Sequence, residues 1–544
     1  MTNGGKQGDL QLKKILFTMT CGPYPDIDGT DSMDLYTSRL TKGQEIFTLR
    51  SYYPALPVYI LAQNVSIPSV ALEYPTYEEF VEELKKGYDY VGINFNTIFF
   101  DNTYRMCKAV KQFSPRTKII LGGYGVTCLR EEFQEEKELL SMADYVCHGE
   151  GVRFVRDLLG EPLDGEIRQE FPSSYIYSMG EKIPFDNVIS ALGCRGACEF
   201  CCTSAFYDYK KVRLVDPAGL WKSIKEKLLK NDCRFVWIYD EDFFADADYV
   251  REMAELIRKD KEIPPEKVRW AGFGSIRSIS QYEVEELAEM GVSAIWIGVE
   301  SKFSELPKRK GRDVKDVFDS LRKAGIQTVG SFIIGWDFQT DENIVEDIDY
   351  FVGLKPTYTQ VSSLMPCPET RLWERLKKEN KLYTEGFRWS KHHLYSIMHR
   401  HTSIKDGDVL KYVNLTQEKL YHENGPSILG TFEVNLEGYV HCMESKNERI
   451  RAQASMYGDW CRKIFPALFA VGAYSPSPGV KKLVKTLQAR YIKEFGAPSF
   501  LSLLKSGLFF CYAAILKLRT FLPHRFKKRK AKRYTRRYSY NGAE

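Results

Sequence analysis

The chain has 544 residues, 44% hydrophobic and 27% charged, an ordinary globular composition that is long enough for three or four domains. Its 13 cysteines are mostly scattered singly, which suits a reducing cytosol and argues against a disulfide framework. Residues 1–9 are polar and lack an apolar segment, so we expect no signal peptide.

The formal net charge of +5 is unevenly distributed. Residues 525–537 hold nine basic side chains and no acidic one, so the rest of the chain sums to −4. A mildly acidic body with a strongly basic tail bears on binding partners rather than on the fold.

Residues 13–160 alternate predicted strands with predicted helices. Strands are expected at 14–17, 88–95, 118–121 and 144–147, a helix covers 104–113, and Thr76 and Glu79 form a capping box ahead of another helix. This pattern predicts a doubly wound, Rossmann-like parallel sheet. Ligands bind such sheets at the carboxyl ends of the strands, and those ends carry Gly122, Gly123, Gly149 and Glu150.

Residues 160–187 are polar and predict a linker or a small hairpin. A second series follows, with helices at 216–228, 249–257 and 314–325 and strands at 235–239, 294–299, 328–334 and 359–364. About six such units fit an open, partial TIM-type barrel. Residues 400–544 are expected to be mostly helical, without strands. The predicted divisions are 1–165, 166–187, 188–400, 401–497 and 498–544.

Three cysteines within eight residues, Cys194, Cys198 and Cys201, carry the most specific signal of the chain. A four-iron four-sulfur cluster normally takes four protein ligands, so three thiolates leave one iron open to a small molecule. A zinc site would need a fourth ligand, and no His lies within 40 residues. Cys202 is adjacent to Cys201 and is poorly placed to share its metal. The spacing therefore favours an open cluster.

Around this motif, residues 188–375 resemble the radical S-adenosylmethionine (SAM) superfamily. The resemblance rests on five motifs in order: the cysteines, residues 239–243 (YDEDF), 297–301 (IGVES), 334–336 (IGW) and 366–370 (PCPET). It implies that the cysteines hold the cluster and that one electron cleaves SAM to a 5′-deoxyadenosyl radical.

The same resemblance implies roles for individual residues. Phe200 would contact the adenine, Asp240 and Glu241 would hold the amino group of SAM, and Glu300, Ser301 and Gly335 lie in motifs that contact SAM or form later turns. An ammonium group is a cation and binds favourably to carboxylates, so the chemistry of Asp240 and Glu241 agrees with the role that the resemblance implies. The alternative for each carboxylate is a solvated loop residue.

Residues 10–160 resemble the cobalamin-binding domain that precedes the barrel in one large subclass. The resemblance rests on residues 119–127 (IILGGYGVT) and 143–151 (ADYVCHGEG). Glycines would let a flat macrocycle approach the backbone. The chain lacks the Asp-x-His-x-x-Gly loop with which many cobalamin proteins supply a lower-face ligand, and His148 lies in a different motif. The alternative is a domain that keeps the sheet and has lost the cofactor.

The C-terminal region predicts an apolar helix, with Leu501, Leu504, Leu508, Tyr512 and Ile515 near one face, followed by the basic tail. Its uncharged run is too short to span a bilayer, but the combination fits an interfacial anchor on an anionic membrane. A core-docked helix with a solvated tail is the equal alternative. Nucleic acid is not expected. Four histidines (His392, His393, His399 and His401) are expected in loops or on the surface.

These observations favour a cobalamin-dependent radical SAM methyltransferase acting on an apolar or lipid-like small molecule. By resemblance, it would use an external electron donor such as flavodoxin or ferredoxin. We expect a cytoplasmic protein, peripheral to the inner membrane face if the tail anchors it. Cyclisation, ring rearrangement and carbon–carbon coupling stay open, as does a non-catalytic protein with a structural cluster.

Overall fold

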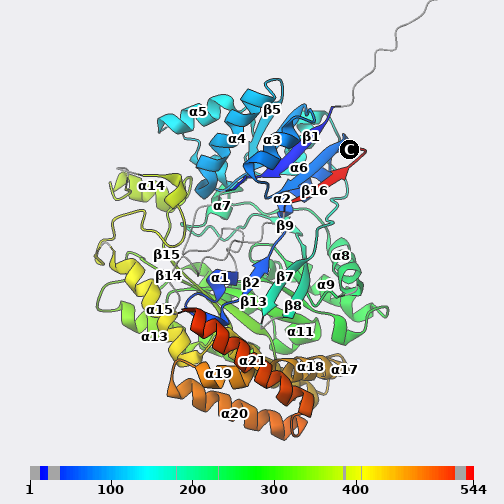
Figure 1. Ribbon diagram of the computed structural model, residues 1–544, viewed down its shortest axis with the longest axis vertical. Helices are drawn as coiled ribbons and strands as arrows, with labels where there is room; N and C mark the ends of the chain where they lie inside the picture. Colours follow the sequence, from blue (N-terminus) through cyan, green and yellow to red (C-terminus); the bar gives the residue numbers. More distant parts are fainter. Residues whose placement is uncertain are drawn as a thin grey trace, which may run out of the picture.

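The molecule stacks an N-terminal α/β domain, a curled sheet and a C-terminal helical bundle along its long axis (Figure 1). The computed structural model describes residues 13–22, 37–130, 132–178, 181–230, 232–383, 387–405, 407–520 and 535–543. Residues 1–9, for which no signal peptide is expected, and most of the basic tail lie outside the described residues.

The N-terminal sheet has the strand order β16-β3-β1-β4-β5-β6. Its parallel strands are β1 (Ile15–Met19), β3 (Ser69–Glu73), β4 (Tyr90–Asn94), β5 (Lys118–Gly122) and β6 (Tyr145–Val146). Helices α2 (Leu56–Gln63) and α6 (Gly151–Leu159) cover one face, and α3 (Tyr77–Leu84), α4 (Phe100–Phe113) and α5 (Gln134–Met142) cover the other. The doubly wound prediction is confirmed.

The last strand of this sheet comes from the other end of the chain. β16 (Arg536–Tyr540) pairs antiparallel with β3, so the expectation of no strand beyond residue 400 was wrong. Arg537 Nε donates to Glu83 Oε1 at 2.9 Å, and the Arg536 guanidinium lies 4.4 Å from the ring centre of Tyr52. An edge strand exposes one side to water, which is why this polar segment carried no apolar alternation.

The second sheet has the order β15-β14-β13-β12-β11-β8-β7-β2. Six strands run parallel: β8 (Glu181–Val188), β11 (Val236–Ile238), β12 (Trp270–Gly274), β13 (Val292–Glu300), β14 (Gln327–Ile334) and β15 (Tyr358–Ser363). The predicted partial barrel of six units is confirmed, although β12 was not foreseen. β7 (Ser174–Ser178) and β8 form a hairpin, so the barrel sheet begins before residue 188.

Helices cover the outer face of the curled sheet: α8 (Pro217–Leu229), α9 (Ala247–Lys259), α11 (Val284–Glu289), α12 (Val314–Lys323) and α13 (Ile344–Gly353). The two edge strands are β15 and β2 (Arg50–Tyr52), and the short helix α1 (Thr37–Leu40) contacts both of them. The inner face of the sheet is therefore enclosed by the strands and by α1.

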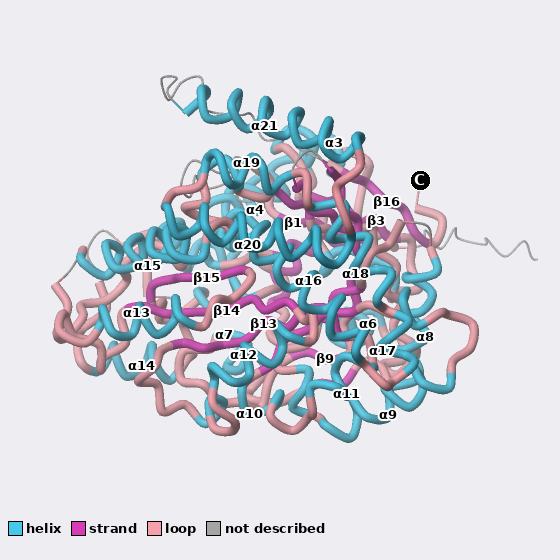
Figure 2. Tube along the Cα trace, turned by 90° about the horizontal axis from the view of Figure 1, so that it is seen from below, coloured by secondary structure: helices cyan, strands magenta, loops and turns pink. Residues whose placement is uncertain are grey.

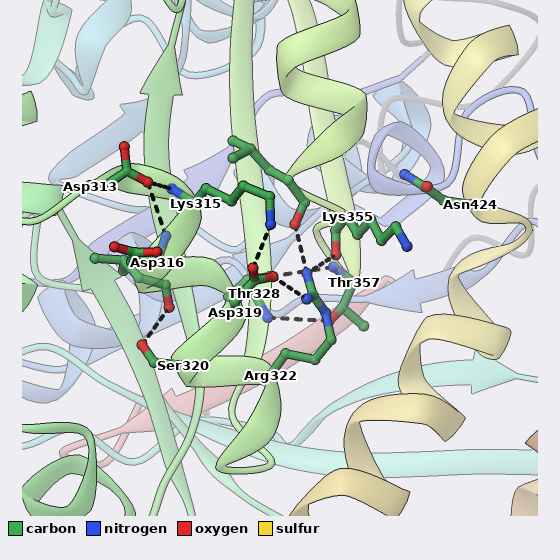
Figure 3. Close-up of polar contacts among 12 residues, drawn as sticks. Asp313, Lys315, Asp316, Asp319, Ser320, Arg322, Thr328, Lys355, Thr357 and Asn424 are labelled. Carbon is green, nitrogen blue, oxygen red and sulfur yellow. Dashed lines mark hydrogen bonds and ion pairs between the residues drawn. The ribbon is translucent and has the colours of Figure 1, made fainter.

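Polar contacts fix both ends of α12, the helix that connects β13 to β14 (Figure 3). Asp313 caps the helix by accepting hydrogen bonds from the backbone N–H groups of Lys315 and Asp316 at 2.9 and 3.1 Å. Near its other end, Arg322 donates to the carbonyl of Leu354 at 2.7 Å and to Asp319 at 2.6 Å. The Arg322 contacts lie near the amino ends of β14 and β15, where contacts in a barrel serve stability rather than chemistry.

The C-terminal bundle comprises α15 (Asp408–Asn424), α16 (Ser427–Glu444), α17 (Glu448–Ala452), α18 (Ala454–Ile464), α19 (Ala467–Tyr474), α20 (Pro478–Phe495) and α21 (Phe500–Thr520). Helices α15, α16, α18, α19 and α20 share a core that includes Phe432, Phe465 and Tyr491, and α17 packs in a separate small cluster through Ile450. α21 lies along the outside of the molecule against α19 (Figure 2).

Candidate active site

The three cysteines lie on a loop beyond the carboxyl end of β8. β9 (Ala191–Leu192) pairs with β10 (Val212–Arg213) before the loop, and α7 (Cys202–Phe206) follows it. Gly193 has φ +76°, and a Cβ there would lie 2.3 Å from the carbonyl oxygen of Lys210. Glycine is therefore required for the sharp turn that leads into Cys194.

The cysteine side chains are half-buried and unbridged. Burial raises the pKa of Cys194 and Cys198, and it raises the pKa of Cys201 to about 11. Thiolate is the metal-binding form, so cluster assembly would release protons. Among the described residues, no three His, Cys, Asp or Glu side chains converge on a single ion. A cluster takes one thiolate per iron, so its ligands need not converge on one point.

Asp240 is fully buried and holds the chain just before the cysteine loop. Its Oδ1 accepts from the backbone N–H groups of Ser190 at 2.6 Å and Ala191 at 3.0 Å, and its Oδ2 accepts from the Ser190 hydroxyl. Arg213 lies 3.7 Å from Oδ2. The resemblance assigned Asp240 to the amino group of SAM; in the structure both of its carboxylate oxygens are hydrogen-bonded to the chain ahead of the cysteine loop.

Glu241 and Glu300 behave differently, because each keeps one buried carboxylate oxygen, Oε2, without a hydrogen-bond partner. Burial raises the pKa of Glu241 to about 7. Glu300 ends β13 after a bulge and has φ +62°, a conformation that non-glycine residues rarely adopt. Glu300 is the last residue of β13, and Glu241 lies three residues beyond the carboxyl end of β11. A cationic or hydroxyl-bearing ligand would satisfy their free oxygens.

Lys308 was not foreseen from the sequence and is a cation at this end of the barrel, as is Lys211. Its ammonium donates to Glu300 Oε1 and lies 5.2 Å from the ring centre of Phe200. Burial would lower the pKa of Lys308, but Glu300, Cys198 and Cys201 outweigh it and raise that pKa. The positive charge of Lys308 is thus held beside the thiols of Cys198 and Cys201. The three-dimensional structure is needed to see this, because a loop brings Lys308 back to the cysteines.

Phe200 packs edge-on against Trp336, with ring centres 5.2 Å apart. Gln339 Oε1 accepts from the backbone N–H groups of Gly335 and Trp336, and Gln339 Nε2 donates to Asp347 at 2.8 Å. Asp347 also accepts from the Ser301 hydroxyl at 2.5 Å. Ser301 and Gly335 therefore belong to one buried network that fixes the ends of β13 and β14.

A cavity of about 450 Å³ separates the carboxyl ends of the two parallel sheets. From the N-terminal domain it is lined by the predicted residues Gly122, Gly123, Gly149 and Glu150. From the barrel side it is lined by residues that include Tyr207, Tyr239 and Glu241. The Glu150 carboxylate itself caps α6, accepting from the N–H groups of Val152 and Arg153 at 2.7 and 2.8 Å.

His148 does not line this cavity. Its Nε2 lies 2.8 Å from Glu369 on a barrel loop, and this carboxylate raises the pKa of His148. His392 and His399 lie in the loops after the barrel, as expected, and both are buried. The two ring nitrogens of His392 contact Thr97 and the carbonyl of Pro366, each at 2.8 Å, which ties the barrel to the N-terminal domain.

Residues 188–351 match the family model described as the radical SAM superfamily. The matched range contains the cysteine loop, Glu241 and Glu300. Residues 188–351 therefore form a radical SAM domain, and such a domain implies a four-iron four-sulfur cluster and SAM. The prediction of this class is confirmed.

Three curated relatives extend the comparison. An uncharacterized methyltransferase of Pyrococcus horikoshii is 23% identical over 363 residues, 60% of this chain and 77% of that protein. Bacteriochlorophyllide d C-12(1)-methyltransferase of Chlorobaculum tepidum is 25% identical over 364 residues, 62% of this chain and 75% of its own. The anaerobic magnesium-protoporphyrin IX monomethyl ester cyclase of Cereibacter sphaeroides is 23% identical over 257 residues, 46% of this chain and 40% of its own.

Among solved structures, the radical SAM methyltransferase TsrM from Kitasatospora setae, with cobalamin and a 4Fe-4S cluster bound, aligns with a TM-score of 0.53 at 11% identity. The alignment covers 83% of this chain and 99% of TsrM. At this identity the likeness establishes the fold: a Rossmann-like domain, a partial barrel and additional helices.

The residues present fit the implied groups. Three cysteines on one loop suit an open cluster, and the free oxygens of Glu241 and Glu300 suit the polar groups of SAM. Gly122 and Gly149 line the large cavity, and a Cβ built at Gly149 meets no atom within 4 Å. That open space suits the close approach of a large, flat ligand such as cobalamin.

Proposed function

We propose that this protein is a cobalamin-dependent radical SAM enzyme that methylates an unactivated carbon of an apolar substrate. The observation that carries the proposal is the cavity between the two sheets. It joins the glycine-lined strand ends of the N-terminal domain to Glu241, beside the cysteine loop. One cavity can thus bring two cofactors together, as the proposed chemistry requires.

When bound, the cluster and SAM would supply hydrogen abstraction from carbon, and cobalamin would supply a methyl group. Cys194, Cys198 and Cys201 would hold the cluster through thiolates. Asp240 fixes the backbone that enters their loop. Glu241 and Glu300 would bind SAM, and the ammonium group of Lys308 orients Glu300 by donating a hydrogen bond to its Oε1. The packed aromatic pair Phe200 and Trp336 would shield the cluster side of the site from water.

None of the described residues that line the cavity is a histidine, and His148 is engaged by Glu369. We therefore propose that cobalamin binds without an imidazole ligand from the protein. Substituting His148 by Ala would leave the amount of retained cobalamin and its absorption spectrum unchanged. A changed spectrum would contradict this part of the proposal.

We also make a proposal about where the protein lies in the cell, based on helix α21. Of the described residues, Phe500–Arg519 form one helix that is long and apolar enough to cross a membrane. α21 instead packs along α19, burying Ser506 and Ala513, and leaves nine large hydrophobic side chains 43% to 83% exposed. Lys505, Lys517 and Arg519 lie on the same helix. We propose a cytoplasmic enzyme whose α21 rests on an anionic membrane surface.

Methylation is tested by the fate of SAM. Protein reconstituted with iron, sulfide and hydroxocobalamin, and given SAM with excess dithionite to reduce the cobalamin from Co(III) to Co(I), would convert SAM to S-adenosylhomocysteine as the reduced cobalamin is methylated. Gly122→Leu would fill the cavity and abolish cobalamin retention, whereas Gly353→Leu, on the remote helix α13, would not. Retention by the Gly122 variant would contradict the assignment of the cavity.

Cyclisation is the second candidate, because the Cereibacter sphaeroides cyclase is among the relatives. A cyclase would produce 5′-deoxyadenosine from SAM without S-adenosylhomocysteine. The two products, separated by mass spectrometry, distinguish the candidates.

A further inference from the structure

The inner face of the half-barrel is lined by a group of aromatic side chains that remain partly exposed. On β11 and β13 the side chains alternate: Val236, Ile238, Ile295 and Ile297 are 0% exposed beneath the outer helices. Trp237 and Trp296, which alternate with them and face the interior, are only half-buried. A closed barrel fills its interior with packed side chains. Here the interior keeps accessible surface.

Three of these rings form one continuous wall across adjacent strands. Phe273 and Trp296 are stacked, with ring centres 5.3 Å apart and planes 26° apart. Trp237 meets Phe273 edge-on at 5.7 Å and Trp296 edge-on at 6.3 Å. Such a wall attracts flat π systems through stacked or edge-to-face contacts.

Two buried polar atoms on this wall have no partner: Nε1 of Trp237, a donor, and Oδ1 of Asn187, an acceptor. The two residues are register partners on β11 and β8, so they lie side by side on the same face. By contrast, Trp296 Nε1 donates to Ser331 at 2.6 Å. Buried polar groups are almost always paired, so a ligand that offers an acceptor and a donor side by side would satisfy both atoms.

The wall adjoins the cofactor cavity, because Tyr239 contacts both Trp237 and Phe273. Asn187 lines that cavity, and so does Tyr239, which lies two residues beyond Trp237 and so about 7 Å along β11. A molecule resting on the wall would therefore reach the end of the barrel where Glu241 and Glu300 lie.

Resting on the proposed function, we infer that the substrate contains a flat, conjugated ring system with a hydrogen-bond donor and acceptor side by side, as in a lactam. The rings of Trp237, Phe273 and Trp296 bind its face or edge. Trp237 Nε1 donates to its acceptor, and Asn187 Oδ1 accepts from its donor.

The test is equilibrium binding of three probes to the reconstituted full-length protein with SAM present and no reductant. 2-Quinolone is flat and carries both groups, naphthalene is flat and carries neither, and decahydroquinolin-2-one carries both but is not flat. We expect 2-quinolone to bind roughly tenfold more tightly than either of the others. Trp237→Phe, which keeps a ring but removes the N–H, should abolish the preference over naphthalene. The control Trp460→Phe, on α18, should not.

Equal affinity for 2-quinolone and its saturated analogue, or no binding of 2-quinolone, would overturn the inference, as would an unchanged preference in the Trp237 variant. Adding dithionite to the same samples and measuring 5′-deoxyadenosine reports separately on the proposed function. Binding without SAM cleavage would count against that function alone, and cleavage without selective binding would count against this inference alone.

Discussion

Asp240→Asn separates the positioning role of Asp240 from a direct role in SAM binding. The fully buried carboxylate accepts three hydrogen bonds from Ser190 and Ala191, with Arg213 3.7 Å away. An asparagine keeps one acceptor oxygen and turns an NH₂ group toward a donor. The loss of one or two charge-assisted bonds costs about 2–4 kcal/mol. For a barrel of this size, that corresponds to a fall in Tm of roughly 6–12 °C.

The assay has two readouts, thermal unfolding with iron content and SAM affinity per loaded cluster. Asp240→Asn should lower Tm and iron content, while the fraction that carries a cluster should bind SAM with unchanged Kd. The matched control is Asp246→Asn, whose partly exposed carboxylate pairs with Arg213 at 2.5 Å, and it should change little. A variant with normal Tm and iron content but weakened SAM binding would refute the positioning role.

Three further predictions concern separate parts of the molecule. Glu241→Gln should weaken SAM binding roughly tenfold in equilibrium dialysis without lowering iron content; lost iron would show a structural role instead. Burial lowers the pKa of His392 to about 4, so the unfolded chain binds its proton first as the pH falls below about 6.5. Stability should therefore fall between pH 6.5 and 4, by up to about 3 kcal/mol, and His392→Gln should remove this part of the fall in urea titrations. An equal fall in the variant would exclude His392 as its cause. Leu508→Ser on α21 should reduce binding to anionic liposomes about tenfold, whereas Leu229→Ser on α8 should not; equal binding by both would exclude α21 as the contact.

Local sequence patterns predicted the elements that depend on short segments of the chain, such as helix caps and buried strands. The capping box at Thr76 and Glu79 formed as predicted, with both of its hydrogen bonds. The six barrel strands could be counted approximately because buried parallel strands are short apolar runs. β12 was missed because Trp270–Gly274 contains two glycines and follows a proline-rich turn.

Features that depend on contacts between residues far apart in the chain could not be predicted from the sequence. β16 pairs with a strand more than 460 residues earlier, and its polar residues match no strand pattern. The contact between Lys308 and Glu300 depends on how a loop folds back. The resemblance to the family motif predicted the same role for Asp240 and Glu241. Adjacent residues at the end of a strand, however, point in opposite directions. One therefore supports the cysteine loop and the other lines the cavity.

The central claim is that three cysteines and a two-sheet cavity serve radical chemistry on SAM beside cobalamin. The most direct measurement is anaerobic reconstitution with iron, sulfide and hydroxocobalamin, removal of unbound cofactor, and addition of SAM and dithionite with products read by mass spectrometry. The account predicts 5′-deoxyadenosine, retained cobalamin, and loss of the product in Cys194→Ala. An intact cluster that never cleaves SAM, with Cys194→Ala altering stability alone, would contradict it.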